Sequence, residues 1–198
     1  GVKHAVAVNS GTSALHLIIR ALGIKEGDEV ITTPFSFIAS ANCILFEKAV
    51  PVFVDIDEET LNIDINQIEE KITNKTKAIL VVDVFGQPVN INKVREIAKK
   101  HNLYVIEDSC EALGSIYQNT KAGSAADAAA FAFYPNKQIT TAEGGIIVTN
   151  NDEIAKLCRS MRSQGRAVTG LWLYHERLGY NYRLSEIHAA LGIAQMER

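Results

Sequence analysis

Seven strand-like runs alternate with helical segments along this 198-residue chain, and this alternation limits the fold more than any other feature. The runs lie at residues 4–9, 29–33, 50–56, 77–85, 103–108, 127–134 and 145–150. Their apolar character is continuous, as in KAILVVDVF, which is typical of strands covered by helices on both faces. The pattern therefore predicts an α/β protein with an open, mostly parallel sheet sandwiched by helices.

Helical patterns lie between several of the strand-like runs and after the last one. They occupy residues 12–23, 37–48, 62–72, 90–102, 152–162 and 184–198. With 47% hydrophobic and 22% charged residues, a chain of this length can bury one sizeable core. The sequence shows no internal repeat, low-complexity segment or linker, so we expect one domain over residues 1–198.

Composition argues against several classes of partner and site. The net charge is −3 without a block of lysine and arginine, which argues against nucleic acid. The apolar runs are too short to span a bilayer, which argues against a membrane. Three scattered cysteines (Cys43, Cys110 and Cys158) form no CxxC motif and indicate a reducing, cytoplasmic compartment. The five histidines show no metal-ligand or triad spacing, so we expect no metal site.

Four strand-like runs are followed by residues of four different chemical types. HAVAVN leads into the turn 10–13, EVITT leads to Phe37, LYVIED ends on Asp108, and DAAAFAFY leads to Lys137. In an open parallel sheet, ligands bind beyond the carboxyl ends of the strands. We therefore expect these residues to share one site.

Lys137 and Asp108 together indicate a particular cofactor chemistry. Lys137 lies in FYPNKQITTAEGG, behind a proline and ahead of paired glycines, between two strand-like runs. A lysine that can form an imine and an acid that can hold a pyridinium proton are the minimum machinery of pyridoxal phosphate catalysis. The alternatives are a solvated lysine and an aspartate that caps the next turn.

The turn at residues 10–13 is a candidate phosphate site. It places a glycine and three hydroxyl residues where a helix begins, and a helix N-terminus favours an anion. Taken alone, an ordinary N-cap is the favoured interpretation of this turn, and a core position is favoured for Phe37. Neither GxGxxG nor GxxxxGK[ST] is present, so a single phosphate fits better than a dinucleotide or a nucleoside triphosphate.

The motifs in combination resemble the DegT/DnrJ/EryC1/StrS family of pyridoxal phosphate-dependent sugar aminotransferases, which have the fold type I, aspartate aminotransferase-like architecture. The resemblance runs through VNSGTSALHL, TPFSFIASAN, FGQP, IEDSCEALGS, FYPNKQITTAEGG and GYNYRLSEIHAALG. It implies that residues 1–198 are the cofactor-binding large domain. It also implies that the family's N-terminal segment and C-terminal small domain lie outside this sequence.

The resemblance implies roles for the residues that would contact the ring of the cofactor. Lys137 corresponds to the lysine that bonds to the cofactor and later moves the proton. Asp108 corresponds to the partner of the pyridine nitrogen, and Phe37 to the residue that stacks on the ring.

The resemblance also implies how the phosphate is held. Gly11 and Thr12, with Ser13, occupy the phosphate-binding turn. Asn181 corresponds to an asparagine that reaches the phosphate of the neighbouring subunit's cofactor. This implies a homodimer with shared active sites.

Two positions depart from the family pattern. Ala132 stands where the family usually has a serine that contacts the phosphate, and losing such a hydrogen bond costs on the order of 1.5–3 kcal/mol. Glu111 stands where glutamine or histidine often approaches the phenolic oxygen of the cofactor. We expect both changes to weaken cofactor affinity without removing the chemistry.

The activity implied is a ping-pong transamination. The amino group passes from an amino-acid donor, glutamate, to a keto group of a nucleotide-linked sugar used in polysaccharide or glycoconjugate biosynthesis. Lysine rather than histidine at position 137 argues against the family's dehydratase branch. Two alternatives stay open: another fold type I enzyme that acts on an amino acid, and a catalytically silent regulator on the same fold.

Overall fold

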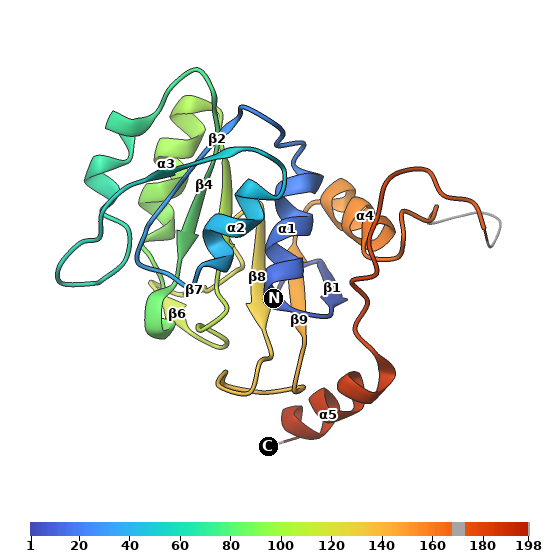
Figure 1. Cartoon of the computed structure of the whole chain (residues 1–198). Coiled ribbons are helices and arrows are strands. Elements are labelled where there is room, and N and C mark those ends of the chain that lie inside the picture. The colour runs from blue at the N-terminus through green and yellow to red at the C-terminus, as the bar shows by residue number, and fades with distance from the viewer. Residues whose placement is uncertain (168–172, 198) are drawn as a thin grey trace.

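The computed structural model describes residues 1–167 and 173–197 and contains a seven-stranded sheet (Figure 1). The order of its strands is β1 (His4–Val8), β9 (Gly145–Thr149), β8 (Ala128–Ala132), β5 (Tyr104–Asp108), β4 (Thr76–Val82), β2 (Glu29–Thr32) and β3 (Val50–Phe53). The strands from β8 to β3 are parallel to one another, whereas β9 is antiparallel to both β8 and β1. The predicted open, mostly parallel sheet is confirmed.

Helices cover the sheet on both sides. The helices are α1 (Gly11–Ala21), α2 (Ala39–Leu45), α3 (Ile91–His101), α4 (Asp152–Met161) and α5 (Glu186–Met196). Figure 1 shows α5 apart from the sheet, near the C-terminus, and no side chain of this helix is buried. Arg198, the last residue of the predicted terminal helix, lies outside the described residues.

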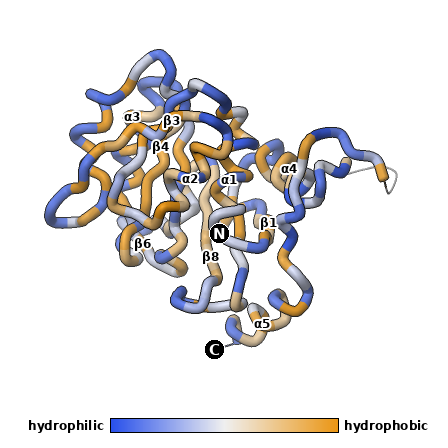
Figure 2. Tube along the Cα trace, viewed as in Figure 1, coloured by the Kyte–Doolittle hydropathy of each residue, from blue (hydrophilic) through white to orange (hydrophobic). Residues whose placement is uncertain are grey.

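Strand β4 buries side chains on both faces of the sheet. Leu80 and Val82 project into a core formed with α1, α2 and α4, whereas Ile79 and Val81 project into a second core formed with α3. Because successive side chains of a strand point to opposite faces, a strand that is covered by helices on both faces is mainly apolar at consecutive positions, as in residues 78–82. Figure 2 shows hydrophobic residues concentrated along the central strands.

The turn between β1 and α1 is compact because a neighbouring strand passes close to it. Ser10 is the N-cap of α1, and its Oγ accepts a hydrogen bond from the Ser13 N–H at 3.1 Å. β9 begins at Gly145, where a Cβ would lie 2.6 Å from the carbonyl carbon and oxygen of Ser10. Glycine at position 145 therefore lets β9 approach the N-terminus of α1.

Residues 62–72 do not form the predicted helix. They contain two short 3₁₀ helices, η1 (Ile65–Gln67) and η2 (Glu69–Lys71). Asp64 Oδ1 accepts hydrogen bonds from both the backbone and the side chain of Asn66 at 3.0 Å. Short polar side chains that bond to nearby backbone compete with α-helix formation, which explains the difference.

A two-stranded hairpin is present that the sequence pattern did not predict. It consists of β6 (Ile116–Tyr117) and β7 (Thr120–Lys121), which pair antiparallel. Gln118 and Asn119 between them both have positive φ, 45° and 64°, as a two-residue type I′ turn requires. Strands of two residues are too short to show an apolar period.

The two-sided burial of β4 gives a stability prediction. Ile79→Ala and Leu80→Ala should each lower the free energy of unfolding by about 2–5 kcal/mol, because each side chain is fully buried in a different core. Urea unfolding of the protein in its complete form measures both values. Lys77→Ala, at an exposed position of the same strand, is the control. A large loss at only one of the two positions would contradict burial of both faces.

Candidate active site

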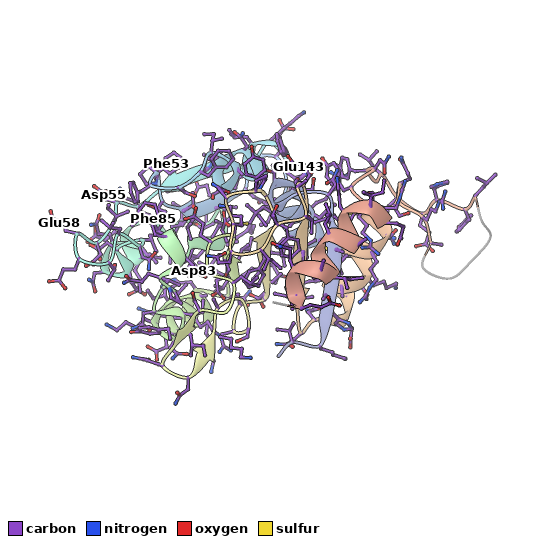
Figure 3. All side chains as sticks on the ribbon, turned by 90° about the horizontal axis from the view of Figure 1, so that it is seen from below. Phe53, Asp55, Glu58, Asp83, Phe85 and Glu143 are labelled. Atoms are coloured by element: carbon purple, nitrogen blue, oxygen red, sulfur yellow. The ribbon has the colours of Figure 1, made fainter. Side chains whose placement is uncertain are left out.

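A cavity of about 680 Å³ lies at the carboxyl ends of β4, β5 and β8 and at the start of α1. Its lining residues come from segments 10–15, 34–39, 82–85, 108–111, 132–137 and 143–144. Asp83, Phe85 and Glu143, which are among them, are labelled in Figure 3. The predicted site residues found in the lining are Gly11, Thr12, Phe37, Asp108, Glu111 and Lys137.

Lys137 reaches the cavity from the turn that follows β8. Its backbone N–H donates to the Tyr134 carbonyl at 3.0 Å, which closes the turn. Its side chain is 15% exposed, and Nζ lies 3.1 Å from Glu111 Oε1. The amine is therefore held in place by an ion pair at the edge of the cavity.

Glu111 connects Lys137 to the loop after β4. Its Oε1 faces Lys137, and its Oε2 accepts a hydrogen bond from the Phe85 N–H at 3.0 Å. Phe85 lies in the left-handed region with φ 53°, and Gly86 follows with φ 85°. A Cβ at Gly86 would lie 2.8 Å from the Glu111 carbonyl oxygen, so this close approach requires glycine. The carboxylate that departs from the family pattern thus links two loops of the cavity.

Asp108 ends β5 with its carboxylate in the cavity lining. Its Oδ2 accepts a hydrogen bond from Ser40 Oγ at 2.7 Å, and its Oδ1 accepts one from the Cys110 N–H at 3.3 Å. Ser40 is itself buried near the start of α2. Both carboxylate oxygens therefore have donors that fix the orientation of the side chain.

The start of α1 forms one wall of the cavity. A Cβ at Gly11 would lie 2.8 Å from Ala132 Cβ and 3.0 Å from Cys110 Sγ, so a side chain at position 11 would close the space between α1 and β8. Thr12 also lines the cavity. Ser13 is buried outside the lining, with its N–H and its Oγ both hydrogen-bonded to Ser10 Oγ. A phosphate role for Ser13 stays a prediction.

Aromatic side chains surround the mouth of the cavity. Phe37 is 77% exposed and lies in the lining. Phe35 and Phe85 meet edge to face, with ring centroids 6.0 Å apart. Phe37 therefore has a free ring face at the cavity, where a flat ligand could stack.

Asn181 lies outside the cavity lining. It is exposed, its backbone bridges to Ser163, and its carbonyl accepts a hydrogen bond from Asn9 Nδ2 at 3.5 Å. Asn181 is thus exposed on this chain and is not one of the residues that line the cavity.

Comparison with known proteins identifies the family. A model of the DegT/DnrJ/EryC1/StrS aminotransferase family matches residues 1–198. The chain belongs to this family. The GDP-perosamine synthase of Escherichia coli O157:H7 is 47% identical over 197 residues, covering 100% of this chain and 54% of that protein. The GDP-perosamine synthase of Caulobacter vibrioides is 48% identical over 198 residues, covering 100% of this chain and 53% of that protein.

Solved structures agree with this assignment. Helicobacter pylori PseC, an aminotransferase involved in the biosynthesis of pseudoaminic acid, superposes with a TM-score of 0.92 at 42% identity, covering 100% of this chain and 54% of that chain. DesV of S. venezuelae superposes with a TM-score of 0.94 at 37% identity, covering 99% of this chain and 52% of that chain. The chain spans about half the length of the curated relatives it matches.

The cavity suits pyridoxal phosphate by its shape and its chemistry. It combines an amine on Lys137, a carboxylate on Asp108, a free aromatic face on Phe37, and a helix start at Gly11 where the absent side chain leaves room.

Within the described residues no group of three or more histidine, cysteine, aspartate or glutamate side chains could hold a metal ion. No helix of the described residues is long and apolar enough to cross a membrane.

Sequence reasoning missed Ser40 and Phe85. Ser40 is one of several hydroxyl residues after β2, and only its contact with Asp108, 68 residues away, distinguishes it. Phe85 lies in the FGQP motif, but its residue type is typical of a strand and gives no sign of a left-handed backbone. The sequence signal that was available is Gly86 directly after it.

Two buried carboxyl groups lie close to the ends of neighbouring strands: Asp83 follows β4 and lines the cavity, whereas Glu107 lies in β5 outside the lining. Asp83 accepts hydrogen bonds from the Val89 N–H at 2.9 Å and from Ser109 Oγ at 2.6 Å. Glu107 accepts one from the Gly123 N–H at 2.9 Å, while its Oε2 is buried with no hydrogen-bond partner among the described residues. Burial, with a further contribution from Asp83, raises the pKa of Glu107 to about 8. Glu107 is therefore protonated at neutral pH.

This raised pKa predicts a loss of stability with increasing pH. The ordinary pKa of glutamate is 4.5, so the stability that protonated Glu107 contributes is complete below that value and is lost as pH rises through about 8. Glu107→Gln keeps a neutral side chain at every pH. The free energy of unfolding of this variant, measured with urea, should therefore rise relative to that of the wild type by on the order of a few kcal/mol between pH 5 and pH 9.

Glu58→Gln, at an exposed loop position, is the matched control and should follow the wild type across the same range. Parallel pH profiles for wild type and Glu107→Gln would contradict a protonated Glu107.

Proposed function

We propose that this protein is a pyridoxal phosphate-dependent aminotransferase that moves an amino group, from glutamate as donor, to a keto group of a nucleotide-linked sugar. The observation that carries the proposal is the position of Lys137 Nζ in a cavity that also contains the Asp108 carboxylate, in a chain of this family.

The three cysteines are free, and two of them are buried, which supports a cytoplasmic location.

Named relatives support a nucleotide-linked sugar as the substrate. The relatives from Escherichia coli and Caulobacter vibrioides are GDP-perosamine synthases, and another, from Campylobacter jejuni, is a UDP-4-amino-4,6-dideoxy-N-acetyl-beta-L-altrosamine transaminase that is 45% identical over 202 residues. The Bacillus subtilis protein SpsC, 42% identical over 207 residues, is named for spore coat polysaccharide biosynthesis. The name of SpsC supports polysaccharide or glycoconjugate biosynthesis as the context of the proposed reaction.

Asp108 and Lys137 would have separate roles in the reaction. Pyridoxal phosphate, when bound, supplies an aldehyde that takes up an amino group and a ring that accepts electrons. Asp108, fixed by Ser40, would keep a proton on the ring nitrogen and so maintain that acceptor. Lys137 Nζ would act as nucleophile towards the cofactor and, once released, would carry the proton to and from the substrate carbon.

Glu111 and the aromatic residues would orient these groups. The Glu111 carboxylate holds Lys137 Nζ at 3.1 Å and is itself fixed by the Phe85 N–H, so the amine approaches from one direction. Phe37 would cover one face of the ring, which excludes water from it. Gly11 and Thr12 at the start of α1 would bind the phosphate through backbone N–H groups.

Asn181 supports an assembly of two copies with shared sites. Its side chain is exposed and outside this chain's own cavity, so it is available to another subunit. The apolar side chains Ile187, Ile193 and Met196 of α5 are also exposed, as expected of a surface covered in the complete protein. A homodimer in which each Asn181 binds the phosphate of the other subunit's cofactor explains both features.

A test of the activity uses Lys137→Arg, which keeps the positive charge but cannot form the covalent bond to the cofactor. With glutamate and a panel of nucleotide-linked keto-sugars, the complete wild-type protein should form amino-sugars, and the variant should lose about 10²–10⁴-fold or more in turnover. Borohydride reduction of the holoenzyme followed by peptide mapping should label Lys137 alone. Lys121→Arg, in the exposed hairpin strand β7, is the control and should behave as wild type.

The same experiment separates the alternative functions. One relative, from Geobacillus stearothermophilus, is named a pleiotropic regulatory protein and is 44% identical over 190 residues. A wild-type protein that converts none of the sugars would favour such a regulator, whereas turnover of amino acids alone would favour another enzyme of the same fold. Label on a lysine other than Lys137 would contradict the site.

Shared sites predict complementation between two impaired variants. Lys137→Arg subunits mixed with Asn181→Ala subunits should regain activity, because one site of each mixed dimer receives both wild-type residues. Statistical mixing gives about one quarter of the sites intact. The assay runs at limiting cofactor, where the loss of a hydrogen bond to phosphate, about tenfold or more in affinity, makes Asn181→Ala measurably impaired alone. If mixed dimers form and no activity returns, both residues serve the same site.

A further inference from the structure

A cluster of polar and aromatic side chains around the buried His16 connects α1 to the segment that carries Asn181. We call it the His16 cluster, and its members are His16, Arg20, Phe46, Glu47, Tyr180 and Tyr182. His16 is 4% exposed although it is a polar residue in the middle of a helix. None of these side chains lines the cavity, so the chemistry described above does not use them.

His16 joins two parts of the chain through its two ring nitrogens. Nε2 donates to Glu47 Oε1 at 2.9 Å, and Nδ1 accepts from the Tyr182 hydroxyl at 3.2 Å. Arg20 donates to both oxygens of Glu47, at 2.8 and 2.7 Å, so the carboxylate is paired on both sides. Burial lowers the pKa of His16, and a neutral ring with its proton on Nε2 satisfies both hydrogen bonds.

Ring contacts hold the two tyrosines as one unit. Tyr180 and Tyr182 are stacked, with centroids 4.8 Å apart and planes 12° apart. His16 lies 4.9 Å from the Tyr180 ring, and the Arg20 guanidinium lies 5.7 Å from the same ring in a cation–π arrangement. Phe46 meets His16 edge to face at 5.1 Å. The tyrosine rings are therefore fixed against α1 and the end of α2.

The two tyrosines flank Asn181, and backbone hydrogen bonds hold this segment on both sides. The Asn9 N–H donates to the Tyr182 carbonyl, and the Tyr182 N–H donates to the Arg162 carbonyl, each at 2.9 Å. Tyr180 and Tyr182 are partly buried, whereas Asn181 and Arg183 are exposed. Side chains of an extended segment alternate between two sides, so fixing the tyrosines inward turns Asn181 outward.

We propose that His16 is a positioning residue for the cofactor phosphate of the partner subunit. It acts through Tyr180 and Tyr182, which present the Asn181 amide at the surface in a fixed direction. The inference rests on the proposed shared active site. Without the His16 cluster, residues 180–182 would become ordered only when Asn181 binds the phosphate. The loss of conformational entropy would then weaken the binding of the phosphate.

The test compares binding of pyridoxal phosphate with binding of pyridoxal, which lacks the phosphate, to the complete dimeric protein. His16→Gln and Asn181→Ala should each weaken pyridoxal phosphate binding by about tenfold or more, while pyridoxal binding stays unchanged. The double variant should bind no more weakly than Asn181→Ala alone, because both changes remove the same contact. Absorbance titration measures the affinities, and sedimentation confirms that each variant is dimeric.

His101→Gln is the matched control. His101 also donates through Nε2 to a glutamate, Glu69 Oε1 at 2.8 Å, but it lies at the end of α3 on the other face of the sheet. This variant should bind both ligands as the wild type does. Tyr182→Phe removes only the hydroxyl that bonds to His16, so it provides the same comparison if His16→Gln fails to fold, with a smaller loss for pyridoxal phosphate alone.

The outcomes separate this inference from the shared site on which it rests. If Asn181→Ala weakens pyridoxal phosphate binding and neither cluster variant does, the positioning role is overturned while the shared site stands. If the cluster variants weaken pyridoxal and pyridoxal phosphate equally, the cluster only supports the fold and the inference is also overturned. If Asn181→Ala has no effect on either ligand, the shared site itself fails.

Discussion

Burial of both faces of the sheet is the constraint on which the rest of this structure depends. Because helices cover β4 and its neighbours on both sides, a polar side chain in the middle of these strands would be desolvated, and Glu107 shows that cost in its raised pKa. Polar chemistry is therefore concentrated where the strands end. Asp108 ends β5 and Lys137 follows β8, so two groups 29 residues apart in sequence meet in one cavity.

Glu111 shows how a departure from a family pattern can be accommodated. A carboxylate in place of glutamine or histidine adds a negative charge to the cavity, but here its two oxygens are used by Lys137 Nζ and by the Phe85 N–H. The second contact requires the left-handed backbone at Phe85 and the glycine after it. The carboxylate, the lysine and the FGQP loop thus form one arrangement, and a change at any of them would affect the other two.

Much of the fold could be predicted from the sequence, and part of the site could not. The continuous apolar runs predicted all seven strands of the main sheet. Asp108 and Lys137 could be assigned to one site because each lies at or shortly after the carboxyl end of a predicted parallel strand. The end of β4 was wrong by three residues, since the Asp83 carboxylate binds the Val89 N–H and turns the chain before Phe85. His16 could not be distinguished from an ordinary core residue, because Glu47 and Tyr182 lie 31 and 166 residues away.

Ala132 gives the His16 cluster added importance. The methyl group at position 132 lies where a Cβ on Gly11 would be only 2.8 Å away, so β8 and α1 meet without the hydroxyl that the family usually places there. Within one subunit, the N–H groups at the start of α1 would then be the proposed donors to the phosphate. In the proposed dimer, the amide of the partner subunit's Asn181 would then contribute a larger share of the free energy of phosphate binding. The same Asn9 that precedes the N-cap Ser10 also bonds to Tyr182 and Asn181. In the proposed dimer, this one short segment would therefore order both the phosphate-binding turn of its own site and the residue that reaches the partner's site.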